Sequence, residues 1–360
     1  MSALVLLALT SSFAAEGEAL QVSPALTTWL EMDTNANRVP DGALGGDNDP
    51  GKLRPPTPDA ERPTLDALTR ADATLALALR QPGLHLSSES AAGVKLFFHE
   101  ASERMAVGQS RVTLITNRLP AELTLALSAF GKARLQRSGR RTYGLVRGDA
   151  TVERALFGVV WRAGLDGQAF EALDDARFSF AGGGLVLGAR APLGAAERFD
   201  VTLDVAGRGF PYAARDLNVP DGRERRTDGA GSLQLQLTSA RRVFLSLGYA
   251  LLRNESNARG ESWWRHRAQA LVGFRLPGQI TVSTSGSLQL TRYDDGVSIG
   301  QAWFLGDEDE TQNMLELSLS KPLFGKLSVE ARGALYGNEL ATEGARFARQ
   351  TAALGLRLEL

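Results

Sequence analysis

Apolar and polar residues alternate along most of this chain, and this alternation limits the folds open to it more than any other feature. The last seven residues, LGLRLEL (354–360), place leucine at every second position with Gly, Arg and Glu between. Because side chains of a β-strand point alternately to its two faces, this pattern predicts a strand with one aliphatic and one charged face.

The same period of two recurs in many other segments. Each run lasts roughly ten residues, the length of a tilted strand that crosses a membrane. No segment approaches the ~18 consecutive apolar residues of a transmembrane helix. The clearest alternating runs are 74–80, 122–132, 199–205, 232–238, 280–290, 315–320 and 327–335.

Composition removes several classes of protein. The chain has 360 residues, a net charge of −1 and no cysteine. The absence of cysteine excludes disulfides, thiolate metal sites and a lipid anchor on cysteine. The near-zero net charge gives no indication of a nucleic-acid partner.

The first residues resemble an export signal. Residues 3–9 form a short apolar run, and small residues follow at 12–15. This predicts a signal peptide over residues 1–15 and one barrel domain over residues 16–360. No Lys or Arg precedes the apolar run, which is unusual for such a signal, and a buried N-terminal helix is the alternative.

Short and long connections take turns along the chain. Short ones fall near 81–83, 239–241 and 276–279, whereas long polar ones cover about 35–63 and 294–310. This alternation is typical of an up-and-down barrel with periplasmic turns and external loops. The count is about sixteen strands, with 14–18 open, if a turn is placed at 147–149 and a loop at 165–176.

Aromatic residues near strand ends support this interpretation. Trp161, Trp263, Trp264 and Trp303 are predicted to form an aromatic girdle beside the long loops, together with Phe210 and Tyr212. Such girdles lie where a barrel meets the membrane surface. The alternative is the core of a soluble β-sandwich or β-helix, which would use fewer bare Leu, Val, Ala and Gly on the outward phase.

Taken together, these segments resemble the bacterial outer-membrane β-barrel class over nearly the whole chain. The resemblance implies an all-β, transmembrane antiparallel barrel in the outer membrane of a Gram-negative cell, with outer-membrane lipid and the barrel insertion machinery as partners. Members of that class often end on an aromatic residue, whereas this chain ends on Leu360. The stretch WLEMDTNANR (29–38) resembles barrels linked to polysaccharide export, which implies periplasmic export proteins as further partners.

Charged residues on the polar phase of the strands are predicted to line an aqueous channel, because about sixteen strands enclose one. Their excess of arginine favours anionic or polyhydroxylated solutes. The alternative is that Arg and carboxylates pair and only hold the wall. The predicted lumen-lining residues are Arg80, Arg111, Lys132, Arg134, Asp200, Asp204, Arg208, Arg265, Arg267, Arg332 and Arg357.

No catalytic, cofactor or metal site is predicted. Asp33, Asn35, Asn37 and Asp41 have the spacing of a calcium loop, but the required Gly and Glu are missing. His99 stands near Ser102 and Glu103, although sequence proximity alone does not make a catalytic group.

Three functions remain open from the sequence. The first is a porin-like, non-enzymatic conduit for hydrophilic solutes. The second is the barrel component of a polysaccharide or surface-export apparatus. The third is an interfacial enzyme, or a structural or adhesive barrel. The solute and the oligomeric state cannot be read from the sequence.

Overall fold

A computed structural model describes residues 19–34, 65–137, 142–173, 176–194, 199–215, 219, 225–240, 242–259, 261–294, 313–337 and 348–360. The predicted signal segment, most of the calcium-like spacing and Trp303 therefore lie outside the described residues. Within the described residues, no helix is long and apolar enough to cross a membrane.

The strands are β1 Ala19–Asp33, β2 Asp66–Gln81, β3 Leu84–Phe97, β4 Met105–Thr116, β5 Thr124–Gln136, β6 Tyr143–Leu156, β7 Val159–Ala172, β8 Phe180–Leu193, β9 Phe199–Arg215, β10 Arg225–Ala240, β11 Val243–Ser256, β12 Trp263–Arg275, β13 Thr281–Tyr293, β14 Asn313–Phe324, β15 Leu327–Gly337 and β16 Ala348–Glu359.

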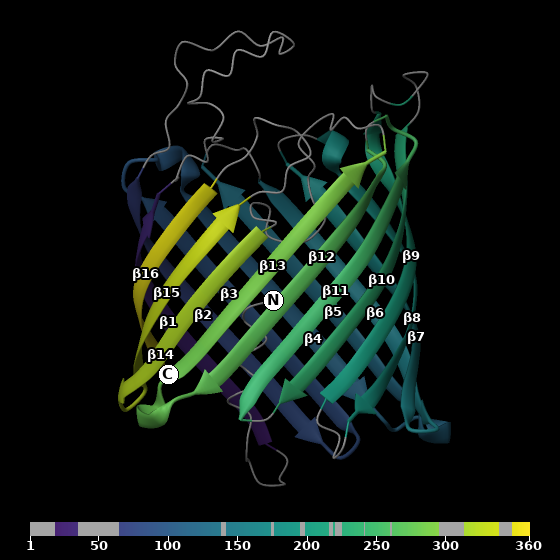
Figure 1. Ribbon diagram of the computed structural model, residues 1–360, viewed down its shortest axis with the longest axis horizontal. Helices are drawn as coiled ribbons and strands as arrows, with labels where there is room; N and C mark the ends of the chain where they lie inside the picture. The colour runs from purple at the N-terminus through teal and green to yellow at the C-terminus, as the bar shows by residue number, and fades with distance from the viewer. Residues whose placement is uncertain are drawn as a thin grey trace.

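The sixteen strands form one closed antiparallel barrel in which each strand pairs with its neighbours in sequence (Figure 1). The last strand closes the barrel, because β16 pairs with β15 on one side and with β1 on the other. A closed sheet leaves no edge strand with unpaired backbone groups. The predicted all-β barrel and its count of sixteen strands are confirmed.

The two faces of the wall differ as the alternation predicts. Outward leucines are well exposed, among them Leu288 at 68% and Leu185 at 65%. On the terminal strand Leu354, Leu356 and Leu358 are exposed as well. Between them Arg357 lies opposite Thr27 of β1 on the inner face, where side chains converge and shield one another. The terminal pattern therefore has aliphatic side chains outside and charged ones inside.

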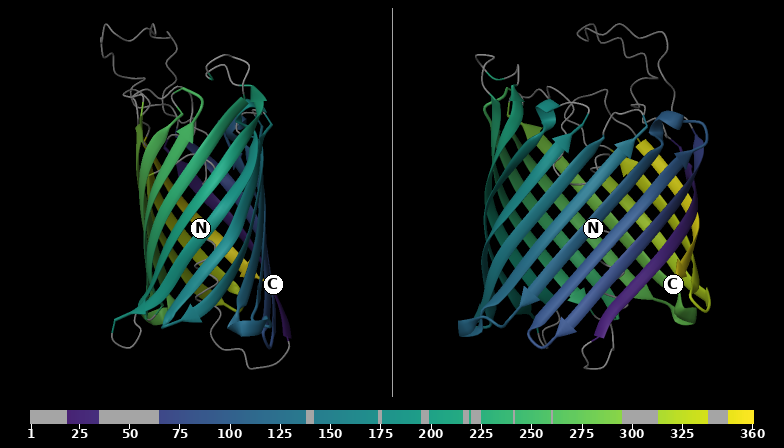
Figure 2. Two further views of the ribbon diagram at one scale, coloured as in Figure 1. Left: turned by 90° about the vertical axis from the view of Figure 1, so that its right-hand side faces the viewer. Right: turned by 180° about the vertical axis from the view of Figure 1, so that it is seen from behind.

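The two ends of the barrel have different connections. At one end the strands are joined by segments such as 34–65 and 294–312, and at the other by turns as short as 82–83 and 325–326. Figures 1 and 2 show the short turns at the bottom of the barrel and the opposite strand ends at the top. We call these the long-loop end and the turn end. Leu360 lies at the turn end, where its backbone N–H donates to Pro24.

One stretch departs from the sequence prediction. The turn placed at 147–149 is wrong, because β6 runs through it and the chain turns at Phe157 and Gly158, both at positive φ. The loop placed at 165–176 is wrong as well, because β7 continues to Ala172. Glycine in this region does not by itself indicate a turn, since Gly148 and Gly164 both lie within strands. A Cβ on Gly164 would lie 2.3 Å from the backbone oxygen of Ala150, so glycine permits a close approach of two strands.

The barrel is flattened rather than round. It is broad in the view of Figure 1 and narrower when turned by 90° in Figure 2. Strands β11–β14 make one broad wall, and β3–β6 make the wall that faces it across the shorter dimension. Side chains on the inner faces of these two walls therefore point towards each other.

Candidate functional site

The inner wall of the barrel carries the candidate site. The pairing register fixes which residues share a face, because directly opposed residues of antiparallel strands point the same way. When the register is followed from strand to strand, the whole set of predicted lumen-lining residues falls on the face opposite the exposed leucines. That set is Arg80, Arg111, Lys132, Arg134, Asp200, Asp204, Arg208, Arg265, Arg267, Arg332 and Arg357.

Strands β7 and β9 are joined by ion pairs that reach over β8. Arg162 on β7 donates from Nε to Asp204 on β9 at 2.7 Å. In the opposite sense, Arg208 on β9 donates to Asp166 on β7, also at 2.7 Å. Glycine on β8 leaves room, since a Cβ on Gly188 would lie 2.1 Å from the Asp204 carboxylate. We call this region the interlocked wall.

Arg162 and Asp166 are partners that sequence reasoning missed. The expected loop from 165 onwards removed Asp166 from the strand, so Asp166 was not considered as a partner of Arg208. A strand assignment that tested whether the outward leucine phase continues through Leu165 would have recovered Asp166. Which acid pairs with which arginine still depends on the pairing register between strands, and the sequence of one strand does not define that register.

An aromatic cluster covers the interlocked wall at the long-loop end. The rings of Phe170 and Phe180 stack with centroids 5.5 Å apart, and Phe180 also contacts Phe210 and Tyr212. All four side chains are buried, as is Tyr143. The expectation that Phe210 and Tyr212 join a girdle facing outward is therefore wrong. Both occupy the inner phase of β9, where they fill the wall.

Charged groups next to this cluster are fully satisfied by one another. Arg226 donates to both carboxylate oxygens of Asp228, at 2.9 and 2.7 Å, and contacts Glu261 at 3.1 Å. The Tyr212 hydroxyl and the Asn254 amide also donate to Asp228. Such a buried network fixes the positions of β9, β10 and β11 at this end.

The seam where the barrel closes is also held by ion pairs. Arg349 of β16 donates to Asp33 of β1 at 2.8 Å, and Arg332 of β15 contacts Glu316 of β14 at 3.1 Å. Asp33, the first residue of the calcium-like spacing, is thus engaged by an arginine and fully buried. Within the described residues, no group of three or more metal-ligating side chains occurs.

Basic residues gather on β4 and β5 of one broad wall. The Arg111 guanidinium lies 5.3 Å from the centre of the Phe130 ring, and the Lys132 ammonium lies 5.8 Å from that of Tyr143. Arg134 donates to Gln136 at 3.3 Å. Glu89 lies directly opposite Arg111 on β3. These contacts hold the cations against the wall while leaving positive charge on its surface.

The facing wall carries arginines among neutral polar groups. Arg265 donates to the Thr291 hydroxyl at 2.9 Å and lies 4.0 Å above the Trp263 ring, and Arg267 lies beside the Gln269 amide. The inner phase of β13 carries only Thr, Ser and Gln between Thr281 and Thr291, and neither β11 nor β12 has a carboxylate on its inner phase. We call β11–β13 the arginine wall.

The four girdle tryptophans do not act as one set. Trp264 and Trp161 face outward, with 42% and 53% exposure, but Trp161 lies next to the turn at 157–158, at the end away from the long loops. Trp263 faces inward against Arg265, because adjacent residues of a strand cannot share a face. Its assignment to an outward girdle is wrong, and Trp303 lies outside the described residues.

His99 has a partner other than those suggested by its sequence neighbours. Its Nδ1 lies 3.0 Å from Asp66, whose carboxylate also accepts from the backbone N–H groups of His99 and Glu100. Glu103 instead accepts a hydrogen bond from Gln136. The Asp66 carboxylate therefore holds the start of the β3–β4 connection in place, and the pair forms a structural link between β2 and that connection.

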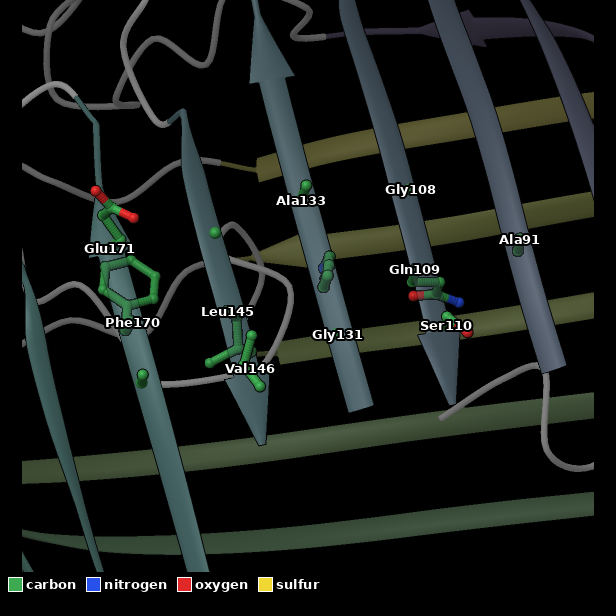
Figure 3. A pocket seen from close by; sticks show the side chains of 13 residues that line it. Ala91, Gly108, Gln109, Ser110, Gly131, Ala133, Leu145, Val146, Phe170 and Glu171 are labelled. Atoms are coloured by element: carbon green, nitrogen blue, oxygen red, sulfur yellow. The ribbon is translucent and has the colours of Figure 1, made fainter. Parts of the chain in front are cut away.

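A shallow cavity of about 660 Å³ lies along β3–β7 (Figure 3). Gly108, Gly131 and Gly144 line it, and a Cβ on any of them would meet nothing within 4 Å. Lys132 and Glu171 are its charged lining residues. It marks a stretch where the wall is thin for lack of side chains.

Comparison with known proteins identifies the fold. No protein-family model matches this chain, and no curated protein matches it. Among solved structures, OmpF of Salmonella typhi in complex with daunomycin is 11% identical with a TM-score of 0.50, covering 97% of this chain and 99% of that chain. Acinetobacter baumannii CdiB is 8% identical with a TM-score of 0.45, covering 94% of this chain and 60% of its own. Vibrio cholerae OmpT in its trimer form is 9% identical with a TM-score of 0.43, covering 95% and 100%.

The likeness to OmpF extends over nearly the whole of both chains and concerns the fold. It agrees with the closed strand order and with the exposed leucines of the outer face. This chain has the fold of the bacterial outer-membrane β-barrel proteins.

Proposed function

We propose that the chain is exported by a signal peptide over residues 1–15, inserts into the outer membrane, and forms a non-enzymatic conduit for small hydrophilic solutes. Long loops face the outside of the cell and the turns face the periplasm. The observation that supports this most is the sorting of side chains: a leucine-covered exterior and a charged interior on a closed sixteen-stranded wall. Barrels of this strand number enclose an aqueous channel.

The distribution of charge supports a preference for anions. Carboxylates on the interlocked wall are engaged by arginines, as Asp204 and Asp166 show. On the two broad walls, the Lys132 ammonium lies against the Tyr143 ring and Arg267 lies beside the Gln269 amide. These walls face each other across the shorter dimension of the barrel (Figure 2). A solute between them meets positive charge and hydroxyl groups from both sides, which favours anionic and polyhydroxylated molecules.

The export role rests on the stretch 29–38, of which the structure describes Trp29 to Thr34. Trp29 faces inward across from Gly355, whose missing side chain lets the indole lie against the wall. Asp33 pairs with Arg349. Both contacts serve barrel closure, which a conduit and an export component share.

Solute uptake by liposomes containing the refolded protein tests the proposal. Swelling rates are compared for a neutral sugar, a sugar phosphate and an amino sugar of similar size, after protease protection has verified insertion. The proposal predicts fastest entry of the sugar phosphate and slowest entry of the amino sugar. Equal exclusion of all three, together with entry in a chain that lacks residues 35–63, would instead indicate a gated export component.

A further inference from the structure

The outer face of β11–β13 carries a polar cluster at the long-loop end. Arg253, Trp264, His266 and Arg292 all belong to the outward phase, and Asp294 follows β13 directly. Towards the turn end, the outward residues of these strands include no charged side chain. The cluster therefore sits at the upper boundary of an apolar belt.

Contacts within the cluster fix the orientation of its groups. Arg253 donates to both oxygens of Asp294, at 2.8 and 2.7 Å, and its guanidinium lies 5.2 Å from the centre of the Trp264 ring. The Tyr249 hydroxyl lies 2.7 Å from Nδ1 of His266. That contact engages one ring nitrogen of His266 and leaves the second for another partner.

A cavity of about 480 Å³ opens between these groups. It is lined by Trp264, His266, Arg292 and Asp294. The Arg292 side chain is exposed, and its positive charge acts on the Asp294 carboxyl. Just below it, Leu290 and Leu288 are 64% and 68% exposed on the same strand and face. The cavity thus joins a polar recess to an apolar surface. This arrangement matches the polar headgroup and apolar chains of an amphiphile.

The lining side chains select one kind of headgroup. An arginine guanidinium matches the geometry of a phosphate group, with two parallel hydrogen bonds. An exposed indole offers a flat apolar face for the C–H side of a sugar ring, and a carboxylate accepts hydrogen bonds from its hydroxyls. A simple phospholipid would use the arginine but neither the indole nor the carboxylate.

We propose that this cavity binds the headgroup of a phosphorylated glycolipid in the outward-facing leaflet. Arg292 and His266 hold the phosphate, Trp264 packs against a sugar ring, and Asp294 accepts from sugar hydroxyls. The acyl chains lie along Leu290 and Leu288. The proposal rests on the orientation given above, with long loops outside, and is independent of what passes through the barrel.

Native mass spectrometry of the refolded full chain tests the site. The probes are lipid A, which is a diphosphorylated disaccharide glycolipid, its dephosphorylated form, and phosphatidylglycerol. We expect lipid A to be retained most strongly. Arg292→Gln and Trp264→Ala should each weaken its binding about tenfold, the size expected for one charge-assisted contact.

Matched controls stand at the other end of the barrel. Trp161→Ala removes an outward indole and Arg154→Gln an outward arginine beside the turn at 157–158. Both should leave lipid A binding unchanged. Equal losses in the control variants, or equal retention of lipid A and phosphatidylglycerol, would overturn the site. Ion conductance of all four variants should match that of the unmodified chain, so failure of the glycolipid site and failure of the conduit give different results.

Discussion

The interlocked wall and the arginine wall use the same residue types in opposite ways. On β7–β9 each arginine faces an acid two strands away, as in Arg162 with Asp204. On the inner face of β12 the arginines contact an indole, a hydroxyl and an amide, as Arg265 does with Trp263 and Thr291. The first arrangement uses charge to tie strands together. The second leaves charge on the surface that a solute would meet.

The difference shows that the number of charges on an inner wall does not predict its role. A paired arginine contributes stability and little net field, because the neighbouring acid cancels its charge at a distance. An arginine among neutral groups contributes little to holding strands together, but its field extends into the channel. Substitutions that affect folding and those that affect selectivity should therefore fall on different sides of the barrel.

The largest expected effect is on the stability of the interlocked side. Phe180→Ala removes the ring that contacts Phe170, Phe210 and Tyr212. Truncating a buried phenylalanine costs about 3–5 kcal/mol, because the surrounding rings cannot close the cavity. Urea unfolding followed by heat-modifiable gel mobility measures the change. A loss below 1 kcal/mol would mean that the aromatic cluster does not hold this wall.

A second substitution tests the ion pairs of the same wall. Asp204→Asn keeps the size of the side chain but leaves Arg162 without its charged acceptor. We expect a loss of about 1–2 kcal/mol, below the value for a fully buried charge because water reaches both groups.

The matched variant on the arginine wall is Arg267→Gln, which should change the free energy of unfolding by no more than about 0.5 kcal/mol. Equal destabilisation by the two variants would contradict the claim that charged residues on the two walls contribute differently to stability.

Selectivity should respond in the reverse order. At ~7 Å in water two unit charges interact by about 0.6 kcal/mol, so reversing one charge shifts the energy of a passing ion by ~1.2 kcal/mol, or about sevenfold. Because the reversal disfavours an anion and favours a cation by this amount, Arg267→Glu should lower the anion-to-cation permeability ratio by the square of this factor, about 50-fold, at low ionic strength, where screening is weakest. Reversal potentials in planar bilayers measure it, with the double variant R162Q/D204N, which removes both charges of one ion pair, as the variant expected to change the ratio least.

The smallest effect concerns an ion pair on the outer face of the barrel. Hydrogen bonds from Arg253 hold the pKa of the Asp294 carboxyl below its usual value. A carboxyl whose pKa is lowered on folding stabilises the folded state above its unfolded pKa, and the gain is lost as the pH falls through the folded pKa. Asp294→Asn should therefore lower the unfolding midpoint slightly at pH 7. The difference from the unmodified chain should disappear in acid, and a difference that grows in acid would contradict this.

Much of the barrel follows from the sequence because its signal is local. Whether Lys132 or Leu127 points inward depends only on the parity of its position within one strand, so alternation alone assigns the face. The phase of Leu354 to Leu358 likewise assigns the two faces of the terminal strand, whereas its pairing with β1 comes from the structure. The connections were placed well where polar loops and turn residues mark them.

The errors arose where one signal has two physical causes. Glycine at 148 suggests a turn, yet glycines in this region let strands approach closely, as Gly164 does against Ala150. Aromatic residues at strand ends suggest an outward girdle. Tyr212 and Trp263 nevertheless point inward, because their positions along the strand have the parity of the inner face. Ion-pair partners such as Asp166 and Arg208 depend on the register of three strands, which no local pattern contains.

Single-channel recording of the refolded protein under a salt gradient tests the central claim most directly. Insertion is verified in the same bilayer preparation. The account predicts steady conductance with a reversal potential of the sign expected for anion preference. A verified, inserted barrel that carries no current, or one that prefers cations, would contradict it.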